Sequence, residues 1–154
     1  MPIEPLSITA AVIGITRLTY DSCKSLNDTI KTIKSAPQQL KDLEKDLETF
    51  QNVIKPAETD LARCGAAESE LSLEQRASLQ ALEPVMGHCK VICDRFSLRL
   101  TQLTSHSSEH RTALRDRIRL NFHESDVQLL KENMAQCQRT LSDALGFANL
   151  FEPS

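Results

Sequence analysis

The stretch LKDLEKDLETFQNVIKPAETDL, residues 40–61, decides the fold of this chain. Its apolar side chains recur at steps of three and four residues, and most positions between them are charged or polar. That period places the apolar side chains along one stripe of an α-helix, which can be buried only against other elements. The predicted stripe comprises Leu40, Leu43, Leu47, Phe50, Ile54, Ala57 and Leu61.

Three further segments carry related patterns. One stripe comprises Leu79, Leu82, Met86, Cys89, Cys93, Phe96, Leu100 and Leu103. Another comprises Val127, Leu130, Met134, Cys137, Leu141, Ala144 and Ala148. The N-terminal segment is looser, with a stripe of Ile8, Ala11, Ile15, Leu18, Ser22, Leu26, Ile30 and Ile33. Because Val12 and Ile13 fall outside that stripe, the beginning of this segment is apolar on nearly all sides.

These patterns predict an all-α chain that folds as a single four-helix-type bundle with an additional short basic helix. The bundle is expected over residues 1–150, followed by a tail at 151–154. In the short helix, Leu114, Ile118 and Phe122 share one face. The long helices are expected near residues 6–34, 37–62, 72–104 and 123–150, and the short one near 112–120.

Local signals place the helix ends. Ser7 can cap the first helix, and Ser35–Gln38 and Ser72–Gln75 have the spacing of capping boxes. Gly65 suits a helix end, and the polar segment Thr101–Thr112 is expected to be a loop.

The core is expected to come from the large apolar residues of these stripes. Pro56 and Pro84 lie inside their patterns and should kink their helices rather than end them. The predicted core comprises Leu43, Leu47, Phe50, Leu82, Met86, Phe96, Leu130, Leu141 and Leu145.

Composition excludes several classes of protein. The 154 residues suffice for one domain, and the 4 glycines are isolated, which excludes a glycine-rich phosphate loop. A net charge of −3 argues against a nucleic-acid-binding protein. The histidines form no metal-ligand motif, and no nucleophile motif occurs, so we expect no enzyme activity and no cofactor. The carboxylates Asp42, Glu44, Asp46 and Glu48 follow the polar face of their helix.

The cysteines indicate a reducing compartment. Cys23, Cys64, Cys89, Cys93 and Cys137 are odd in number and lack paired short spacings, so we interpret them as small buried side chains without disulfides. Cys89 and Cys93 lie four residues apart, but a zinc site needs further ligands that the sequence does not indicate. No metal is therefore expected.

Two features are not needed for an ordinary helix bundle: an uncharged N-terminal run and a cluster of arginines. The run Pro5–Thr16 is uncharged, and its candidate membrane-active residues are Leu6, Ile8, Ala11, Val12, Ile13 and Ile15. As a helix this run covers about 18 Å, less than a bilayer core, and the alternative is a core helix buried on all sides. The basic cluster of Arg111, Arg115, Arg117 and Arg119 is either a solvated face or a site for anionic lipid headgroups.

Several segments resemble the fungal N-terminal domains of STAND proteins, the HeLo-like family, which has a relative in azaphilone pigment gene clusters. The opening Pro5-Leu-Ser-Ile-Thr-Ala-Ala-Val-Ile-Gly14-Ile and the Ala36-Pro37 junction before Leu40 carry most of the resemblance. It extends over nearly the whole chain, through Leu82, Cys89 and Phe96 and through Arg117, Phe122, Leu130, Cys137 and Leu141.

The resemblance implies a HeLo-like bundle that serves as the N-terminal effector or signalling domain of a fungal NLR-like receptor. It implies a cytoplasmic protein that oligomerises with itself on activation and inserts its N-terminal helix into the plasma membrane. The consequence in that family is programmed cell death in heterokaryon incompatibility. It also implies a downstream NACHT or NB-ARC module, or an amyloid-motif partner.

Two other interpretations remain open. A non-lytic adaptor or homotypic interaction domain would self-associate without binding membranes. An enzyme or carrier would use a sizeable pocket in the bundle, with polar groups converging in it.

Overall fold

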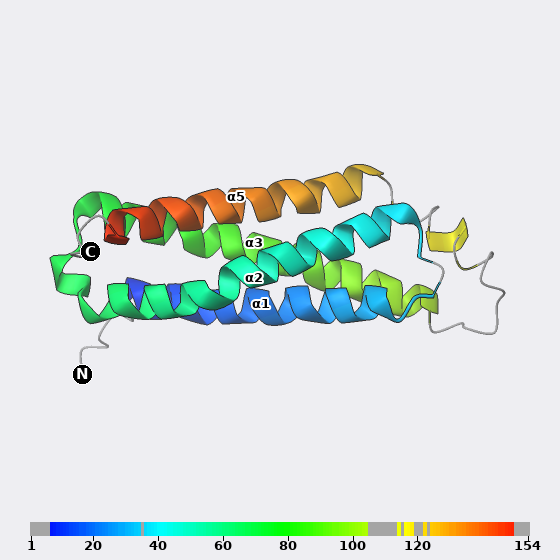
Figure 1. The fold of residues 1–154 in the computed structure, drawn as a ribbon, viewed down its shortest axis with the longest axis horizontal. Coiled ribbons are helices and arrows are strands. Elements are labelled where there is room, and N and C mark those ends of the chain that lie inside the picture. Colours follow the sequence, from blue (N-terminus) through cyan, green and yellow to red (C-terminus); the bar gives the residue numbers. More distant parts are fainter. Residues whose placement is uncertain are drawn as a thin grey trace, which may run out of the picture.

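The computed structural model describes residues 7–34, 36–104, 114, 116–118, 122 and 124–149. This part of the chain forms four long helices and a short 3-10 turn, η1, at Glu68–Glu70 (Figure 1). The long helices are α1 (Ile8–Lys31), α2 (Gln38–Ala66), α3 (Leu73–Thr104) and α5 (Glu124–Asn149). Leu114 and residues 116–118 are also helical, within the short helix expected at 112–120. The prediction of an all-α bundle is confirmed.

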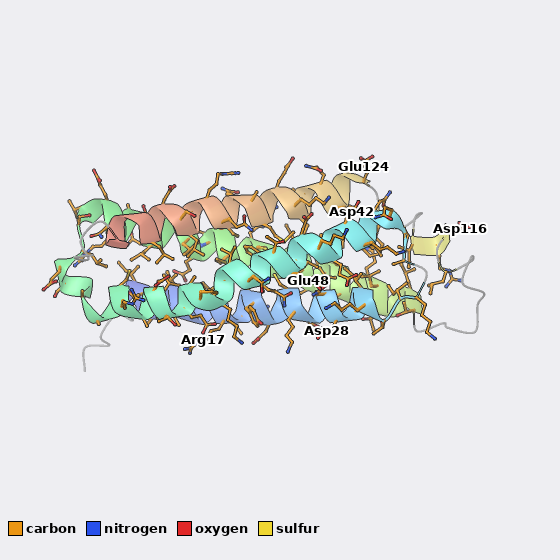
Figure 2. All side chains as sticks on the ribbon, in the orientation of Figure 1. Arg17, Asp28, Asp42, Glu48, Asp116 and Glu124 are labelled. Carbon is orange, nitrogen blue, oxygen red and sulfur yellow. The ribbon has the colours of Figure 1, made fainter. Side chains whose placement is uncertain are left out.

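Successive long helices run in alternating directions along the bundle (Figure 1). α1 packs against α2 and α3, and α5 packs against the same two helices. α1 and α5 therefore occupy opposite corners, and the apolar stripes of all four helices meet along a common axis. The labelled side chains of Arg17 and Glu124 extend away from the bundle (Figure 2).

The core follows the predicted stripes of α2, α3 and α5 closely. Every member of the α2 stripe is buried. Two predicted positions differ: Leu103 and Leu145 are only partly buried. Leu145 lies near the end of α5 and lines a surface hollow with Pro56 and Ala57, so fewer side chains cover it. Ala148 lies in the part of α5 for which no side chain is described.

The helix starts confirm two predicted caps and correct a third. Ser7 Oγ accepts the backbone N–H of Ala10 at 3.0 Å, and Ser72 and Gln75 bond reciprocally at 2.8 and 3.1 Å. The predicted capping box at the start of α2 is wrong. Pro37 is the N-cap and makes no side-chain capping bond, and Gln38 instead donates to Asp42 at 3.0 Å. Ser35 lies outside the described residues.

Helix α3 ends at Thr104, which agrees with the predicted range of 72–104. The polar segment from Thr101 was also expected to be a loop, but residues 101–104 are helical. The hydroxyl groups of Thr101 and Thr104 donate to the carbonyls of Ser97 and Leu100, at 2.8 and 2.9 Å. These local bonds satisfy the polar side chains inside a helix, while buried Leu100 continues the apolar stripe. Residues 105–112 of the expected loop lie outside the described residues.

Candidate functional site

The first half of α1 contains the predicted membrane-active residues, and the structure buries them to different degrees. Val12 is fully buried, whereas Ile8, Ala11, Ile13 and Ile15 are half-buried. Gly14 and Leu18 are exposed, so the segment is not a core helix buried on all sides. Leu6 lies outside the described residues.

The predicted stripe of α1 is wrong in its first half. Ile8, Ala11, Ile15 and Leu18 were expected to face the core, but Leu18 is 51% exposed and the other three are half-buried. The buried positions of this half are Thr9, Val12, Thr16 and Thr19. They lie one residue later, which is about 100° further around the helix.

The second half of α1 sets this orientation. Cys23, Leu26 and Ile30 are buried there. Four residues before Cys23 lies Thr19, and three residues before that lies Thr16, so both threonines share the buried face. Because an unbroken helix keeps its period, the phase set by the more strictly amphipathic second half carries into the first half. The apolar residues at the start could not choose a face by themselves, since they occur on nearly all sides of the helix.

Hydroxyl groups consequently enter the core on α1. Thr19 Oγ1 donates to the carbonyl oxygens of Ile15 and Met86, at 2.7 and 3.1 Å. Thr9 is 1% and Thr16 0% exposed, yet the Oγ1 atom of neither has a hydrogen-bond partner in the described structure. A buried hydroxyl without a partner costs about 1–3 kcal/mol, so this face is weaker than an aliphatic one. Only extrapolation from Cys23 and Leu26 would have found these threonines in the sequence.

The N-terminal end of α1 packs closely against the C-terminal end of α2. A Cβ atom placed on Gly65 would lie 3.3 Å from Cγ2 of Thr9, tighter than ordinary van der Waals contact. Gly65, expected near a helix end, is thus the penultimate residue of α2 and also permits this approach.

Exposed ion pairs add little to the attachment of α1. Arg17 Nε lies 3.4 Å from Glu58 Oε2, and Lys31 Nζ lies 3.0 Å from Glu48 Oε1; both pairs join α1 to α2. Each pair is solvent-exposed, and water and salt screen such pairs, so each contributes little. Apolar packing therefore provides most of the energy that holds α1 in the bundle.

The basic cluster can be described only in part. Arg117 is half-buried, and Arg111, Arg115 and Arg119 lie outside the described residues. The apolar face of this segment agrees with prediction, since Ile118 and Phe122 are each 1% exposed. The ring of Phe122 packs against Phe96 of α3, with centroids 5.1 Å apart. This contact fixes the segment against the bundle.

The cysteines are all buried and reduced, and three of them converge. The sulfur atoms of Cys23, Cys89 and Cys93 all lie within 4.8 Å of one another. The sequence showed only that Cys89 and Cys93 are one helical turn apart. Packing of α1 against α3 adds Cys23.

No helix in the described part of the chain contains a stretch both long and apolar enough to cross a membrane.

Comparison with known proteins identifies the family. No curated protein and no solved structure matches the chain. A family model described as "Pigment biosynthesis cluster protein PigL N-terminal" matches residues 3–154. This agrees with the resemblance of the opening and of the Ala36-Pro37 junction to the family with a relative in pigment gene clusters. Because the model covers nearly the whole sequence, the chain belongs to the pigment biosynthesis cluster protein PigL N-terminal family.

Proposed function

We propose that this chain is the N-terminal effector domain of a fungal NLR-like STAND protein, in which oligomerisation releases the first half of α1 to bind and permeabilise a membrane. One observation carries the proposal. This half of α1 buries Thr9 and Thr16 with unpartnered hydroxyl groups, while apolar Ile8, Ile13 and Ile15 are only partly buried. The helix thus places polar groups in the core and leaves apolar groups partly in water.

Release of α1 improves the surroundings of both sets of side chains. In the bundle, the two hydroxyls lack partners that water would supply. At a membrane interface, the isoleucines would bury their remaining exposed surface among acyl chains, at about 25 cal/mol per Å². Release also removes the favourable packing of Val12, which is fully buried in the bundle. Oligomerisation must supply the difference between these two states.

A single copy of α1 is too short in its uncharged part to span a bilayer. Several copies brought together by a downstream NACHT or NB-ARC module, or by an amyloid motif, would share a pore. Thr9 and Thr16, which share one face of the helix, would then face the pore, and Arg17 would extend to the headgroups. The basic cluster of Arg111, Arg115, Arg117 and Arg119 would attract anionic lipids, with about 1 kcal/mol per residue near the surface. The protein would be cytoplasmic at rest and at the plasma membrane when active.

The alternative is a non-lytic adaptor, and one surface favours it. Val91 and Leu98 lie two turns apart on α3 and are 42% and 60% exposed. Such a pair offers a docking point for another chain without any movement of α1.

Leakage from anionic liposomes, with the chain fused to an inducible oligomerisation module, separates the two functions. The informative variant is Ile13→Asp. Ile13 is half-buried, so the monomer should still fold, whereas Val12→Asp would put a charge at a fully buried site. A carboxylate at the centre of an inserted helix costs about 2.5–3.5 kcal/mol, so leakage should fall at least tenfold. Leu98→Asp on α3 makes the same chemical change outside α1 and should leave leakage unchanged.

Circular dichroism of each monomer shows whether the fold is retained. Equal leakage by the oligomerised wild-type chain and the folded Ile13→Asp variant would remove α1 from the mechanism. Loss of self-association in Leu98→Asp, measured by sedimentation, would then support the adaptor.

A further inference from the structure

The centre of the bundle gathers four cysteines from three helices. Cys23 lies on α1, Cys89 and Cys93 on α3, and Cys137 on α5, and all four are 0% exposed. The sulfur atoms of Cys23, Cys89 and Cys93 form a group within 4.8 Å of one another, and those of Cys23 and Cys93 are 3.6 Å apart. We call Cys23, Cys89 and Cys93 the thiol triad.

The spacing of the triad suits one metal ion. Metal–sulfur bonds of about 2.3 Å hold three sulfurs around a central ion about 4 Å from one another. The Cys23–Cys93 separation is 3.6 Å and none in the triad exceeds 4.8 Å, so small rotamer changes would bring all three sulfurs to bonding distance. Thiolates are soft ligands that select Cu(I), zinc or iron–sulfur clusters.

The number of ligands favours Cu(I) over zinc. Zinc takes four ligands, or three with a water molecule in the fourth position. Cys137 is the nearest further candidate, but it falls outside the group and its Sγ bonds to the carbonyl oxygen of Val85 at 3.4 Å. The triad residues are closed to solvent, which excludes water as an easy fourth ligand. Cu(I) is satisfied by two or three sulfurs.

We propose that Cys23, Cys89 and Cys93 form a buried binding site for a single Cu(I) ion. On binding, each ligating sulfur loses its proton to solvent as its S–H bond breaks and a sulfur–copper bond forms, and no electron is transferred. Because Cys23 belongs to α1 and the other two ligands to α3, the ion joins the two helices and stabilises the closed bundle.

The test uses the whole chain, reduced and free of oxygen, titrated with Cu(I) in competition with a chromophoric Cu(I) chelator. The wild-type chain should retain one equivalent of Cu(I) and melt several degrees higher with it. Cys23→Ala and Cys93→Ala should each weaken Cu(I) retention at least a hundredfold. Cys64→Ala is the matched control, because Cys64 is also buried but lies outside the group. That variant should bind as the wild type does.

Copper-edge X-ray absorption on the wild-type chain tests the ligands without any variant and should show three sulfurs at about 2.3 Å. Failure of the wild-type chain to retain Cu(I) would overturn the site. So would nitrogen or oxygen ligands, or equal retention by the folded Cys23→Ala and Cys93→Ala variants. A stable zinc complex that Cu(I) does not displace would overturn the assignment of the metal, as would a Cys23–Cys93 disulfide formed in place of bound copper.

Discussion

The hydroxyl of Thr19 lies 3.1 Å from the carbonyl oxygen of Met86 and joins α1 to α3 inside the core. Thr16, one turn earlier on the same buried face, has no partner for its hydroxyl among the described residues. Both side chains are 0% exposed. The two threonines therefore differ chiefly in whether a hydrogen bond offsets the loss of water, which makes them a matched pair for experiment.

Thr16→Val should raise the free energy of unfolding by about 1–2 kcal/mol, because it removes a buried hydroxyl that has no partner. Thr19→Val makes the same change where the hydroxyl is bonded and should lower this free energy by about 0.5–1.5 kcal/mol. Denaturant unfolding followed by circular dichroism measures both. Equal shifts of the same sign would show that the hydroxyl of Thr16 finds a partner in solution. Under the proposed function, Thr16→Val should also reduce liposome leakage by holding α1 in place.

Ser7→Ala and Ser72→Ala should each lower the free energy of unfolding by about 0.5–2 kcal/mol, because each removes a helix cap. Their local effects should differ. Hydrogen exchange should become faster in the first turn of α1 only for Ser7→Ala, and in the first turn of α3 only for Ser72→Ala. Identical exchange patterns in the two variants would contradict local capping.

Leu47→Ala and Leu130→Ala should each lower the free energy of unfolding by about 2–5 kcal/mol, since both side chains are fully buried and their truncation leaves cavities. Leu129 is adjacent to Leu130 but 49% exposed, so Leu129→Ala should change stability by less than about 0.5 kcal/mol. Comparable losses for Leu129→Ala and Leu130→Ala would mean that the buried face of α5 is misplaced.

The Lys31–Glu48 pair predicts a small pH dependence of stability. Glu48 accepts a hydrogen bond from Lys31. This bond, and next the positive charge of the lysine, lower the pKa of Glu48 from its ordinary value of 4.5. The contribution is therefore complete above that value and is lost as the pH falls through the lowered pKa. The same bond raises the pKa of Lys31, so at the alkaline end the contribution is lost as the pH rises through that raised pKa.

Melting temperature measured against pH at low salt tests this pair. Wild type should exceed Glu48→Gln near neutral pH, and the difference should vanish in acid and in high salt, because both groups are exposed. Glu83→Gln, at an exposed position on α3, serves as the control and should follow the wild-type curve. A difference between wild type and Glu48→Gln that persists in acid would contradict the ionic origin of the effect.

The sequence by itself determined the helices and three of the four buried faces. In α2, Leu43, Leu47 and Phe50 are buried as predicted, because charged residues between them leave a single face that can be apolar. The cap at Ser7 and the capping box at Ser72–Gln75 were equally predictable, since their bonds reach only three residues along the chain.

The side of the first half of α1 that faces the core was set by the rest of the helix and by its packing, and not by the residues of that half. Isoleucine, valine and alanine surround that half, so several faces were nearly equivalent in apolar character. Continuity with Cys23 and Leu26 then turned Thr16 and Thr19 inward, where the Met86 carbonyl bonds one of them. Packing likewise brought Cys23 to Cys89 and Cys93. Spacing along a chain determines which residues share a helix face, but contacts between residues on different helices depend on the rotation and height at which those helices pack.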